Sequence, residues 1–283
     1  MNHYIINPHS GTNNKATFLR IVSLLKSDPQ HIIWETTQPL EAVDFAKKAI
    51  QQGATKIIAI GGDGTINEVA SVLVGKLIPL GIIPVGSGNG LARHLNIPLN
   101  YKKAFQKTLV GASIKIDVGY INHKPFFCTA GIGFDAAVAH RFANSQGRGL
   151  INYMKATIIT LFKYSPIKVR VNNAPAEKVF SLSIANANQF GNNAFISPFS
   201  NIQDGQLELV KIGILNKLQA GILAVRLFKK SIHHSKNVTL ESCKESSIHY
   251  LNNAPIHIDG ENLLTDNELL NITISPLALT VIV

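Results

Sequence analysis

The stretch A-I-G-G-D-G-T-I-N-E at residues 59–68 combines three glycines with one acidic residue, directly after an apolar run. Gly61, Gly62 and Gly64 allow backbone N–H groups to point at phosphate oxygens, and a following helix offers its N-terminus to the same anion. A carboxylate in a phosphate site is repulsive unless it holds a metal or takes a proton, so Asp63 predicts Mg²⁺ binding or general-base catalysis. The alternative is a simple strand–helix turn in which Asp63 caps the helix. The sequence contains no P-loop and no complete dinucleotide-binding glycine motif.

A second glycine-rich turn, P-V-G-S-G-N-G-L-A-R, occupies residues 84–93. Its hydroxyl and amide side chains, Ser87 and Asn89, are suited to phosphate or ribose, and the alternative is a turn with an N-cap Ser or Asn. The polar loop N-P-H-S-G at 7–11 and the pair T-T at 36–37 also follow apolar strands. Each of these two, taken singly, is more typical of a turn than of a ligand contact.

Six motifs occur in a fixed order along the chain: N-P-H-S-G, W-E-T-T, G-G-D-G-T-I-N-E-V, P-V-G-S-G-N-G-L-A-R, D-G-Q-L-E-L at 204–209 and I-D-G-E at 258–261. With this set the chain resembles the diacylglycerol kinase catalytic domain family of lipid kinases, which includes bacterial diacylglycerol kinases and the sphingosine and ceramide kinases. G-G-D-G-T followed by D-G-E is highly specific. The first motif alone would also admit NAD kinases and phosphofructokinase-like enzymes.

The resemblance implies an α/β ATP-binding domain of the NAD kinase and phosphofructokinase type over residues 1–116, and a mainly antiparallel β-sandwich domain for the lipid substrate over residues 117–276. It implies that the closing strand, 277–283, returns to the first domain. Mg²⁺ is the implied cofactor and ATP the co-substrate. The implied nucleotide-binding residues are Asn7, Ser10, Gly11, Thr36, Gly61, Gly62, Asp63, Gly64, Thr65, Asn67, Ser87, Gly88 and Asn89.

The same resemblance makes Glu261 the expected proton acceptor, with Asp259 beside it and Asp63 near Mg²⁺ and the phosphates; which of the three is the base stays open. In an extended segment Asp259 and Glu261 face the same side, as a catalytic pair would, although D-G-E alone also reads as a hairpin turn. The resemblance also implies a loop that binds a structural Mg²⁺. An ordinary hairpin turn without a metal is an equally good interpretation of the same residues. The implied metal-binding residues are Asp204, Asn201 and Gln206, the last two through backbone oxygens.

The second turn departs from one form of the family. Many bacterial members carry an acidic residue after the turn's Asn, in a T-x-N-D-F-A-R pattern, where this chain has Gly90 and Leu91. The form here is nearer to that of sphingosine and ceramide kinases. We therefore expect transfer of the ATP γ-phosphate to a lipid hydroxyl of diacylglycerol or sphingoid type, with no choice between the two.

Apolar runs precede each of these polar loops and predict the elements that position them. Buried strands are expected at 3–6, 31–36, 56–60 and 80–84, alternating with helices at 14–27, 40–52 and 66–74 and one starting near residue 89. Strands that are apolar on both faces predict a parallel sheet covered by helices. Ligands of such sheets bind beyond the carboxyl ends of the strands, where both glycine turns lie.

The pattern changes after about Ile114 and predicts a second, mainly antiparallel β domain. One hairpin is expected around residues 122–123, and another between strands at 169–171 and 179–187. Helices are expected near 149–163 and 216–230, and shorter strands at 206–212, 237–241, 246–251, 255–258 and 269–274.

The net charge of +10, from 27 Lys and Arg against 17 Asp and Glu, predicts attraction to an anionic partner. The 7% aromatic residues are not interleaved with the basic ones, so no nucleic-acid partner is expected. No apolar run reaches the ~18–20 residues that span a bilayer, so membrane contact should be peripheral. The segment 216–236 has an apolar stripe and a basic end, typical either of an interfacial helix or of a helix packed on the second domain.

Two isolated cysteines and an N-terminus without a secretory signal favour a cytoplasmic location, at the inner face of the membrane. Two other functions remain open at this level. The first is a kinase of a soluble substrate, as in NAD kinases, and the second is a non-catalytic module that binds nucleotide or lipid. The oligomeric state is open as well, with a homodimer among the options.

Overall fold

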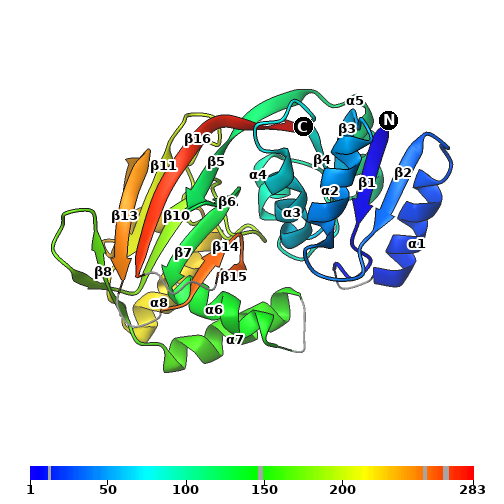
Figure 1. Cartoon of the computed structure of the whole chain (residues 1–283). Coiled ribbons are helices and arrows are strands. Elements are labelled where there is room, and N and C mark those ends of the chain that lie inside the picture. The colour runs from blue at the N-terminus through cyan, green and yellow to red at the C-terminus, as the bar shows by residue number, and fades with distance from the viewer. Residues whose placement is uncertain (12–13, 146–148, 251–253, 264–267) are drawn as a thin grey trace. The chain divides into compact units, whose positions relative to one another are not determined.

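The computed structural model describes residues 1–11, 14–145, 149–250, 254–263 and 268–283 (Figure 1). The chain divides into two compact units, one of residues Met1–Ile116 with Leu277–Val283 and one of residues Asp117–Pro276. Among the described residues, no helix is long and apolar enough to cross a membrane.

The first unit is built on a parallel sheet with the strand order β2-β1-β3-β4. The strands are β1 (Asn2–Ile6), β2 (His31–Glu35), β3 (Lys56–Gly61) and β4 (Leu80–Pro84). Ile6 pairs with Ile60, and Ile60 pairs with Ile83, so the carboxyl ends of β1, β3 and β4 are level with one another. Val281, near the end of β16 (Leu269–Ile282), pairs in parallel with Leu80 and extends the sheet beside β4. The loops after β1, β3 and β4 are therefore brought to one edge.

Helices connect the strands of this unit. They are α1 (Asn14–Leu25), α2 (Glu41–Gln51), α3 (Asp63–Leu73), α4 (Gly90–His94) and α5 (Tyr101–Val110). The prediction started α3 at Ile66, but the helix begins at Asp63 and has Gly62 as its N-cap. The prediction missed α5, which buries only Ala104 and Thr108 and so shows little apolar periodicity.

The second unit contains two antiparallel sheets. One has the order β12-β11-β10-β7-β14-β15, and the other contains β16, β13, β8 and β9 with the β5–β6 hairpin. The strands not yet named are β5 (Ser113–Ile121), β6 (Lys124–Phe126), β7 (Thr129–Gly133), β8 (Ile167–Val171), β9 (Glu177–Val179), β10 (Ser181–Ala185), β11 (Leu207–Ile212), β12 (Val238–Cys243), β13 (Glu245–Tyr250), β14 (Ile256–Ile258) and β15 (Glu261–Leu263). Residue 251, predicted as the end of one strand, lies outside the described residues.

One apolar cluster joins side chains of both sheets, among them Ile132 and Leu182 from the first sheet and Ile248 and Leu270 from the second. The two sheets therefore form a sandwich around a shared core. The predicted fold class, a parallel α/β part followed by an antiparallel β-sandwich, is confirmed.

The second unit differs from the prediction in two places. Residues 179–187 were expected to form one strand, but β9 ends at Val179 and β10 begins at Ser181, in different sheets. The backbone of Phe180 bonds to Ile212 between them, so the chain changes sheets within one residue. The prediction also missed α6 (Phe134–Ala143), which begins directly after β7 with no intervening loop.

Helices α7 (Leu150–Lys163) and α8 (Lys217–Phe228) lie on the outer face of the β10–β11–β12 part of the sandwich (Figure 1). A second apolar cluster holds them there, with Leu161 of α7 and Leu223 of α8 packed together with Val210 of β11. This packing buries one face of each helix and leaves the opposite face outward.

Candidate active site

The two glycine turns pack directly against each other. A Cβ atom added at Gly86 would lie 2.5 Å from the Cα of Gly62, and one at Gly88 would lie 2.7 Å from an Asp63 carboxylate oxygen. A Cβ at Gly61 would lie 2.5 Å from the side chain of Thr65, within the same turn. Gly86 and Gly88 are therefore required by the contact between the turns, and Gly61 by a contact within its own turn. A pattern of glycines alone cannot distinguish such contacts from close approach of a ligand.

The Asp63 side chain fastens the second turn to the first. One carboxylate oxygen accepts a hydrogen bond from the backbone N–H of Asn89 at 2.8 Å, and the other accepts from the N–H of Gly90 at 2.7 Å. Asp63 does not cap its own helix, since Gly62 is the N-cap and receives no side-chain bond. The carboxylate therefore joins two loops, and its two bonded partners lie 26 and 27 residues away in sequence.

Asn89 is held in a left-handed backbone conformation, with φ of 52°. Its side-chain Nδ2 donates to the carbonyl oxygen of Gly86 at 2.8 Å, which fixes the orientation of the amide. The Oδ1 atom is buried and has no partner within the described part of the chain. A buried acceptor without a donor is costly, so this atom is suited to a donor group on a bound molecule.

A cavity of about 410 Å³ opens beside this turn, at the carboxyl ends of β1 and β4. That volume lies within the range of small-molecule binding sites. Of the predicted nucleotide-binding residues, those that line the cavity are Asn7, Ser10, Gly11, Ser87 and Asn89. Arg93, Asn100 and Tyr101 complete the polar part of the wall, and Phe18 and Ile21 of α1 supply an apolar part.

The remaining predicted nucleotide-binding residues do not line the cavity. They lie at the end of β3 and the start of α3 or in the neighbouring loops: Thr36, Gly61, Gly62, Asp63, Gly64, Thr65, Asn67 and Gly88. Asn7 and Thr65 bond to each other through their side chains at 3.2 Å, and the Ser10 hydroxyl accepts from the Gly62 N–H at 3.3 Å. Thr36 is buried and its hydroxyl faces the carbonyl oxygen of Ile6 at 3.4 Å. Hydrogen bonds thus connect the cavity wall to the first glycine turn and the start of α3. Thr36 is not part of this network and contacts the end of β1 instead.

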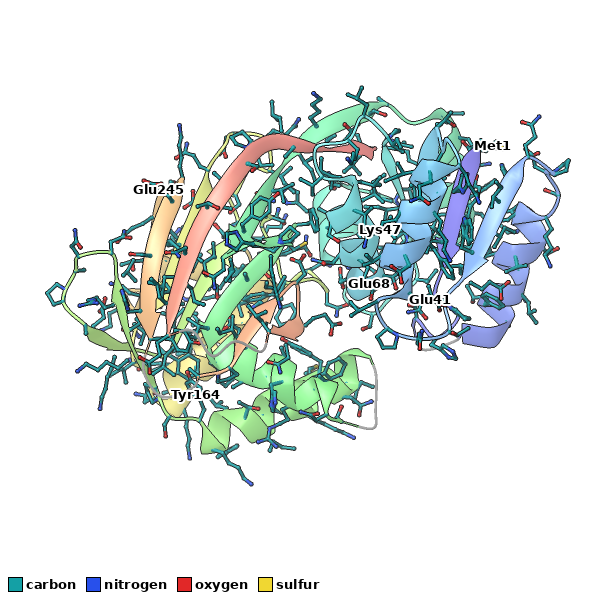
Figure 2. All side chains as sticks on the ribbon, in the orientation of Figure 1. Met1, Glu41, Lys47, Glu68, Tyr164 and Glu245 are labelled. Atoms are coloured by element: carbon teal, nitrogen blue, oxygen red, sulfur yellow. The ribbon has the colours of Figure 1, made fainter. Side chains whose placement is uncertain are left out.

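The loop that follows Thr36 is anchored by two carboxylates, which Figure 2 labels on α2 and α3. Glu41 accepts from the N–H of Thr37 at 2.7 Å, and Glu68 accepts from the N–H of Leu40 at 3.2 Å. The Thr37 bond, the largest contribution, lowers the pKa of Glu41. These contacts fix the loop that follows the W-E-T-T motif. No residue of the motif lines the cavity.

In the second unit, D-G-E forms a two-residue hairpin between β14 and β15. Ile258 pairs with Glu261, and the intervening Asp259 and Gly260 have φ values of 49° and 84°, as a type I′ turn requires. The hairpin alternative for this motif is thus realised. Glu261 is exposed as the first residue of β15, and among the described residues no hydrogen bond or ion pair engages its carboxylate.

Asp259 has a different environment from Glu261. Its carboxylate accepts three backbone hydrogen bonds, from Phe127 at 2.9 Å, Cys128 at 2.8 Å and Thr129 at 3.0 Å. These donors form the loop between β6 and β7, so Asp259 pins the hairpin to that loop. The two carboxylates of the predicted pair are therefore inequivalent, one bonded to the backbone and the other open to an incoming group.

A buried polar cluster contacts the same hairpin through His257. Asp135 of α6 accepts hydrogen bonds from the Ser181 and Ser183 hydroxyls, each at 2.7 Å, and lies 3.2 Å from Nε2 of His257. The other ring nitrogen of His257, Nδ1, lies 3.3 Å from the backbone nitrogen of Gly260. The cluster thereby links α6 to the turn that carries Glu261.

Burial favours a higher pKa for the Asp135 carboxyl, but the His257 hydrogen bond and charge and the two serine hydroxyls outweigh it, so the pKa is lowered. Burial and the negative charge of Asp135 together raise the pKa of Tyr153 to about 12. Tyr164, which follows α7 and is labelled in Figure 2, has its pKa raised for the same two reasons.

The predicted metal loop is a tight turn stabilised by its own side chains. Asp204 accepts from the N–H of Gln206 at 3.0 Å, and Asn201 accepts from the N–H of Gln203 at 3.1 Å. Asp117, fully buried in β5, accepts from the N–H of Gly205 at 2.7 Å. In the described ranges no three His, Cys, Asp or Glu side chains are grouped as metal ligands. A metal at this loop would rest on one exposed carboxylate, backbone oxygens and water, a donor set that suits Mg²⁺.

Three residues of these clusters were not predicted: Asp117, Asp135 and His257. Each leaves a weak signal, because each is a polar side chain within or directly beside an apolar stretch, in I-K-I-D-V, G-I-G-F-D-A and P-I-H-I-D. Burial of such groups requires partners. Apart from the N–H of Gly260 beside His257, these partners lie between 46 and 122 residues away in the sequence, so no local pattern identifies them.

Two family models match the chain. The model of the diacylglycerol kinase catalytic domain matches residues 3–121, and the model of the YegS C-terminal NAD kinase beta sandwich-like domain matches residues 128–283. The chain is 29% identical over 205 residues to a probable YegS-like lipid kinase of Klebsiella pneumoniae, an alignment that covers 69% of either protein. It is 26% identical over 270 residues to a diacylglycerol kinase of Staphylococcus carnosus, covering 91% of this chain and 87% of that protein.

Solved structures agree at the level of the fold. A diacylglycerol kinase structure from Bacillus anthracis superimposes with a TM-score of 0.71 at 20% identity, and covers 99% of this chain and 96% of its own. Another structure from the same organism reaches a TM-score of 0.79 at 22% identity, with the same coverage. The two matched models together extend over nearly the entire sequence. The chain therefore belongs to the diacylglycerol kinase catalytic domain family, with a C-terminal domain of the YegS type, and is a kinase.

Proposed function

We propose that this kinase transfers the γ-phosphate of ATP to the hydroxyl of a lipid, of diacylglycerol or sphingoid type, in a Mg²⁺-dependent reaction. The observation that carries the nucleotide part is the cavity beside the second glycine turn, with the buried Oδ1 of Asn89 at its wall and no donor for it within the described residues. A ribose hydroxyl or an adenine amino group supplies such a donor. The lipid part rests on family membership and on the names of the relatives.

Within this proposal, the residues around the first turn bind and orient the nucleotide. Asp63 holds Asn89 and Gly90 in place through its two oxygens, and Asn7 and Ser10 fix the first loop against that turn. Phosphoryl transfer depends mainly on such positioning and on charge stabilisation. When bound, Mg²⁺ would neutralise the charge of the phosphates, and the Asp63 carboxylate offers the kind of oxygen ligand that this ion prefers.

We assign the two carboxylates of D-G-E to different roles. Glu261, exposed and without a bonded partner among the described residues, is the proton acceptor for the lipid hydroxyl. Asp259 is a positioning residue, because three backbone amides occupy its oxygens. We assign Asp204, with the backbone oxygens of Asn201 and Gln206, to a structural Mg²⁺ site.

The acceptor lipid lies in a bilayer, so the enzyme has to reach a membrane surface. We propose peripheral contact on the cytoplasmic side. This location follows from the substrate class rather than from any single residue, and the segment 216–236 was the sequence's candidate for the contact.

The direct test is an assay with radiolabelled ATP against vesicles that contain diacylglycerol, sphingoid base, ceramide or monoacylglycerol, and against NAD as a soluble acceptor. Labelling of one lipid, lost on removal of Mg²⁺, is the expected result. In the same assay Glu261→Gln should lower kcat at least roughly 100-fold while ATP affinity and the unfolding midpoint stay unchanged. Labelling of NAD alone, or full activity of Glu261→Gln, would overturn the corresponding part of the proposal.

A further inference from the structure

The outward faces of α7 and α8 expose two apolar stripes. On α7, the exposed fractions are 71% for Ile151, 52% for Met154, 54% for Ile158 and 64% for Phe162. These positions are spaced by three or four residues and so share one face of the helix. Large apolar side chains gathered in this way on a soluble surface indicate a contact surface.

Helix α8 repeats the pattern. Its exposed apolar residues are Leu218 at 75%, Ile222 at 50%, Val225 at 54% and Phe228 at 52%. The buried face of the same helix points the other way, through Leu223, into the cluster that it shares with α7. Both helices therefore turn their buried faces to the sandwich and their apolar stripes outward.

The two stripes lie next to each other. The ammonium group of Lys217, the first residue of α8, stands over the ring of Phe162 in the last turn of α7, at 4.5 Å from the ring centroid. Leu161 beside Phe162 packs in the same cluster as Leu223. Figure 1 shows both helices on the same side of the second unit. We call this surface, formed by the exposed residues of α7 and α8, the α7–α8 face.

The two sequence segments that form this face carry charged side chains of positive sign only. The segments 136–176 and 209–240, which contain α7 and α8, include no Asp or Glu and hold twelve of the chain's 27 Lys and Arg residues. These two segments therefore account for the whole of the chain's net charge of +10. Lys155, Lys163, Lys217, Lys229 and Lys230 are all exposed on or directly beside the two helices. Apolar stripes bordered by basic side chains suit an anionic lipid surface, which accepts both the apolar side chains and the cations.

We propose that the α7–α8 face docks on an anionic lipid bilayer, with both apolar stripes inserted at the headgroup level and the lysines at the phosphates. The inference deepens the proposed function, since it names the surface by which the kinase reaches its lipid. Docking does not require catalysis, however, so the two can fail separately. It also replaces the single helix 216–236 of the sequence prediction with a surface to which α7 contributes equally.

The test is co-sedimentation of the full chain with vesicles of phosphatidylcholine alone and of phosphatidylcholine with phosphatidylglycerol, at low and high salt. Wild type should bind the anionic vesicles, and should release from them as salt rises, because screening shortens the range of the lysine contacts. Glu261→Gln should bind as wild type does. Loss of kinase activity with binding intact would count against the proposed function alone.

Matched variants then test the face itself. Ile158→Ser with Phe162→Ser on α7, and separately Leu218→Ser with Ile222→Ser on α8, should each weaken vesicle binding roughly tenfold or more. The control is Leu77→Ser with Val110→Ser in the first unit, which are 89% and 85% exposed and should leave binding unchanged. Because all six side chains are exposed, the variants should keep the circular dichroism spectrum of wild type.

A pair of lysine substitutions tests the contribution of the lysines separately from that of the apolar side chains. Lys155→Gln with Lys163→Gln should weaken binding to anionic vesicles about 30-fold, whereas the exposed pair on α5, Lys102→Gln with Lys103→Gln, should not. The proposal is overturned if face and control variants bind alike, or if wild type binds phosphatidylcholine as well as anionic vesicles. It is also overturned if wild type is a dimer that the face variants turn into a monomer, because the face would then be covered by a second copy.

Discussion

At the scale of single residues, the candidate carboxylates differ in the hydrogen bonds that they accept. Asp63 accepts two backbone N–H groups and Asp259 accepts three, and in both cases the donors belong to a different loop. Glu261 lies in the same motif as Asp259 and yet is exposed. The geometry thus separates two carboxylates that hold loops together from a third that is exposed, the one to which we assign proton transfer.

Asp63→Asn tests the shaping role. An amide offers one acceptor oxygen, so one of the two N–H groups of Asn89 and Gly90 would face an NH₂ group. We expect the free energy of unfolding to fall by about 1.5–3 kcal/mol, since hydrogen bonds to a charged group are lost, and ATP affinity to fall with it. Urea unfolding and ATP titration measure the two effects.

Asp204→Asn, measured without Mg²⁺, is the matched control for Asp63→Asn. Its side chain is exposed, and the amide oxygen still accepts from the N–H of Gln206. Stability should therefore stay within about 0.5 kcal/mol of wild type. Equal stability of Asp63→Asn and wild type would refute the role of Asp63 in holding the second turn.

The lowered pKa of Asp135 predicts a pH dependence of stability. A depressed folded-state pKa stabilises the protein at every pH above the unfolded value of 3.8, and this stabilisation disappears as pH falls through the folded pKa. Free energies of unfolding measured from pH 7 to pH 3 should therefore drop more steeply below pH 4 in wild type than in Asp135→Asn. Asp44→Asn, on the exposed face of α2, should keep the wild-type slope. Parallel curves for wild type and Asp135→Asn would contradict the buried ionised cluster.

At the scale of elements, the glycine turns after β3 and β4 form a unit because they pack on each other. Cα atoms of the two turns come so close that a methyl group at Gly86 would overlap Gly62. The parallel register of β3 and β4 brings the turns to the same level, and Asp63 then bonds them together. The cavity wall at Ser87 and Asn89 depends on this pairing.

Gly86→Ala should destabilise the protein by about 1–3 kcal/mol, as overpacking does, and should lower ATP affinity because the second turn has to move. Gly221→Ala is the contrasting change, since nothing lies within 4 Å of its added Cβ and the residue is inside α8. It should stabilise the protein by up to about 1 kcal/mol through helix propensity. Thermal or urea unfolding of both variants measures the difference, and a neutral Gly86→Ala would contradict the packing of the two turns.

At the scale of the whole molecule, the two compact units hold different parts of the proposed chemistry. The cavity and both glycine turns belong to the first unit, whereas Glu261, the Asp204 loop and the α7–α8 face belong to the second. Binding of a nucleotide should therefore stabilise the units unequally.

Hydrogen exchange measured with and without a non-hydrolysable ATP analogue tests this division. Exchange should slow most at 7–11, 61–64 and 86–90, where the loops surround the cavity. Addition of GTP or AMP at the same concentration serves as the comparison for specificity. Protection confined to residues 117–276 would contradict the assignment of nucleotide binding to the first unit.

Much of the fold followed from local chemistry. Apart from Lys56, the runs at 56–60 and 80–84 carry no charged or polar side chain and are typical of buried strands, and the glycine-rich turns after them end those strands. The alternation with helices then leads to a parallel sheet, as observed. The prediction missed α5, whose apolar face is too small to be visible, and α6, which follows β7 without a break. It also joined β9 and β10, because the change of sheet at Phe180 depends on distant partners.

The sequence by itself determined the order of motifs, the family to which they belong and the sheet edge at which they gather, because these depend on residue types and on periodicity along the chain. The tertiary structure alone decided what each residue does there. It showed that Gly86 and Gly88 are required by contact with the first turn, that Asp63 and Asp259 bond to backbone amides of other loops, and that α7 joins α8 in one apolar and basic face. Each of these facts is a distance between residues remote in sequence, which only the folded chain defines.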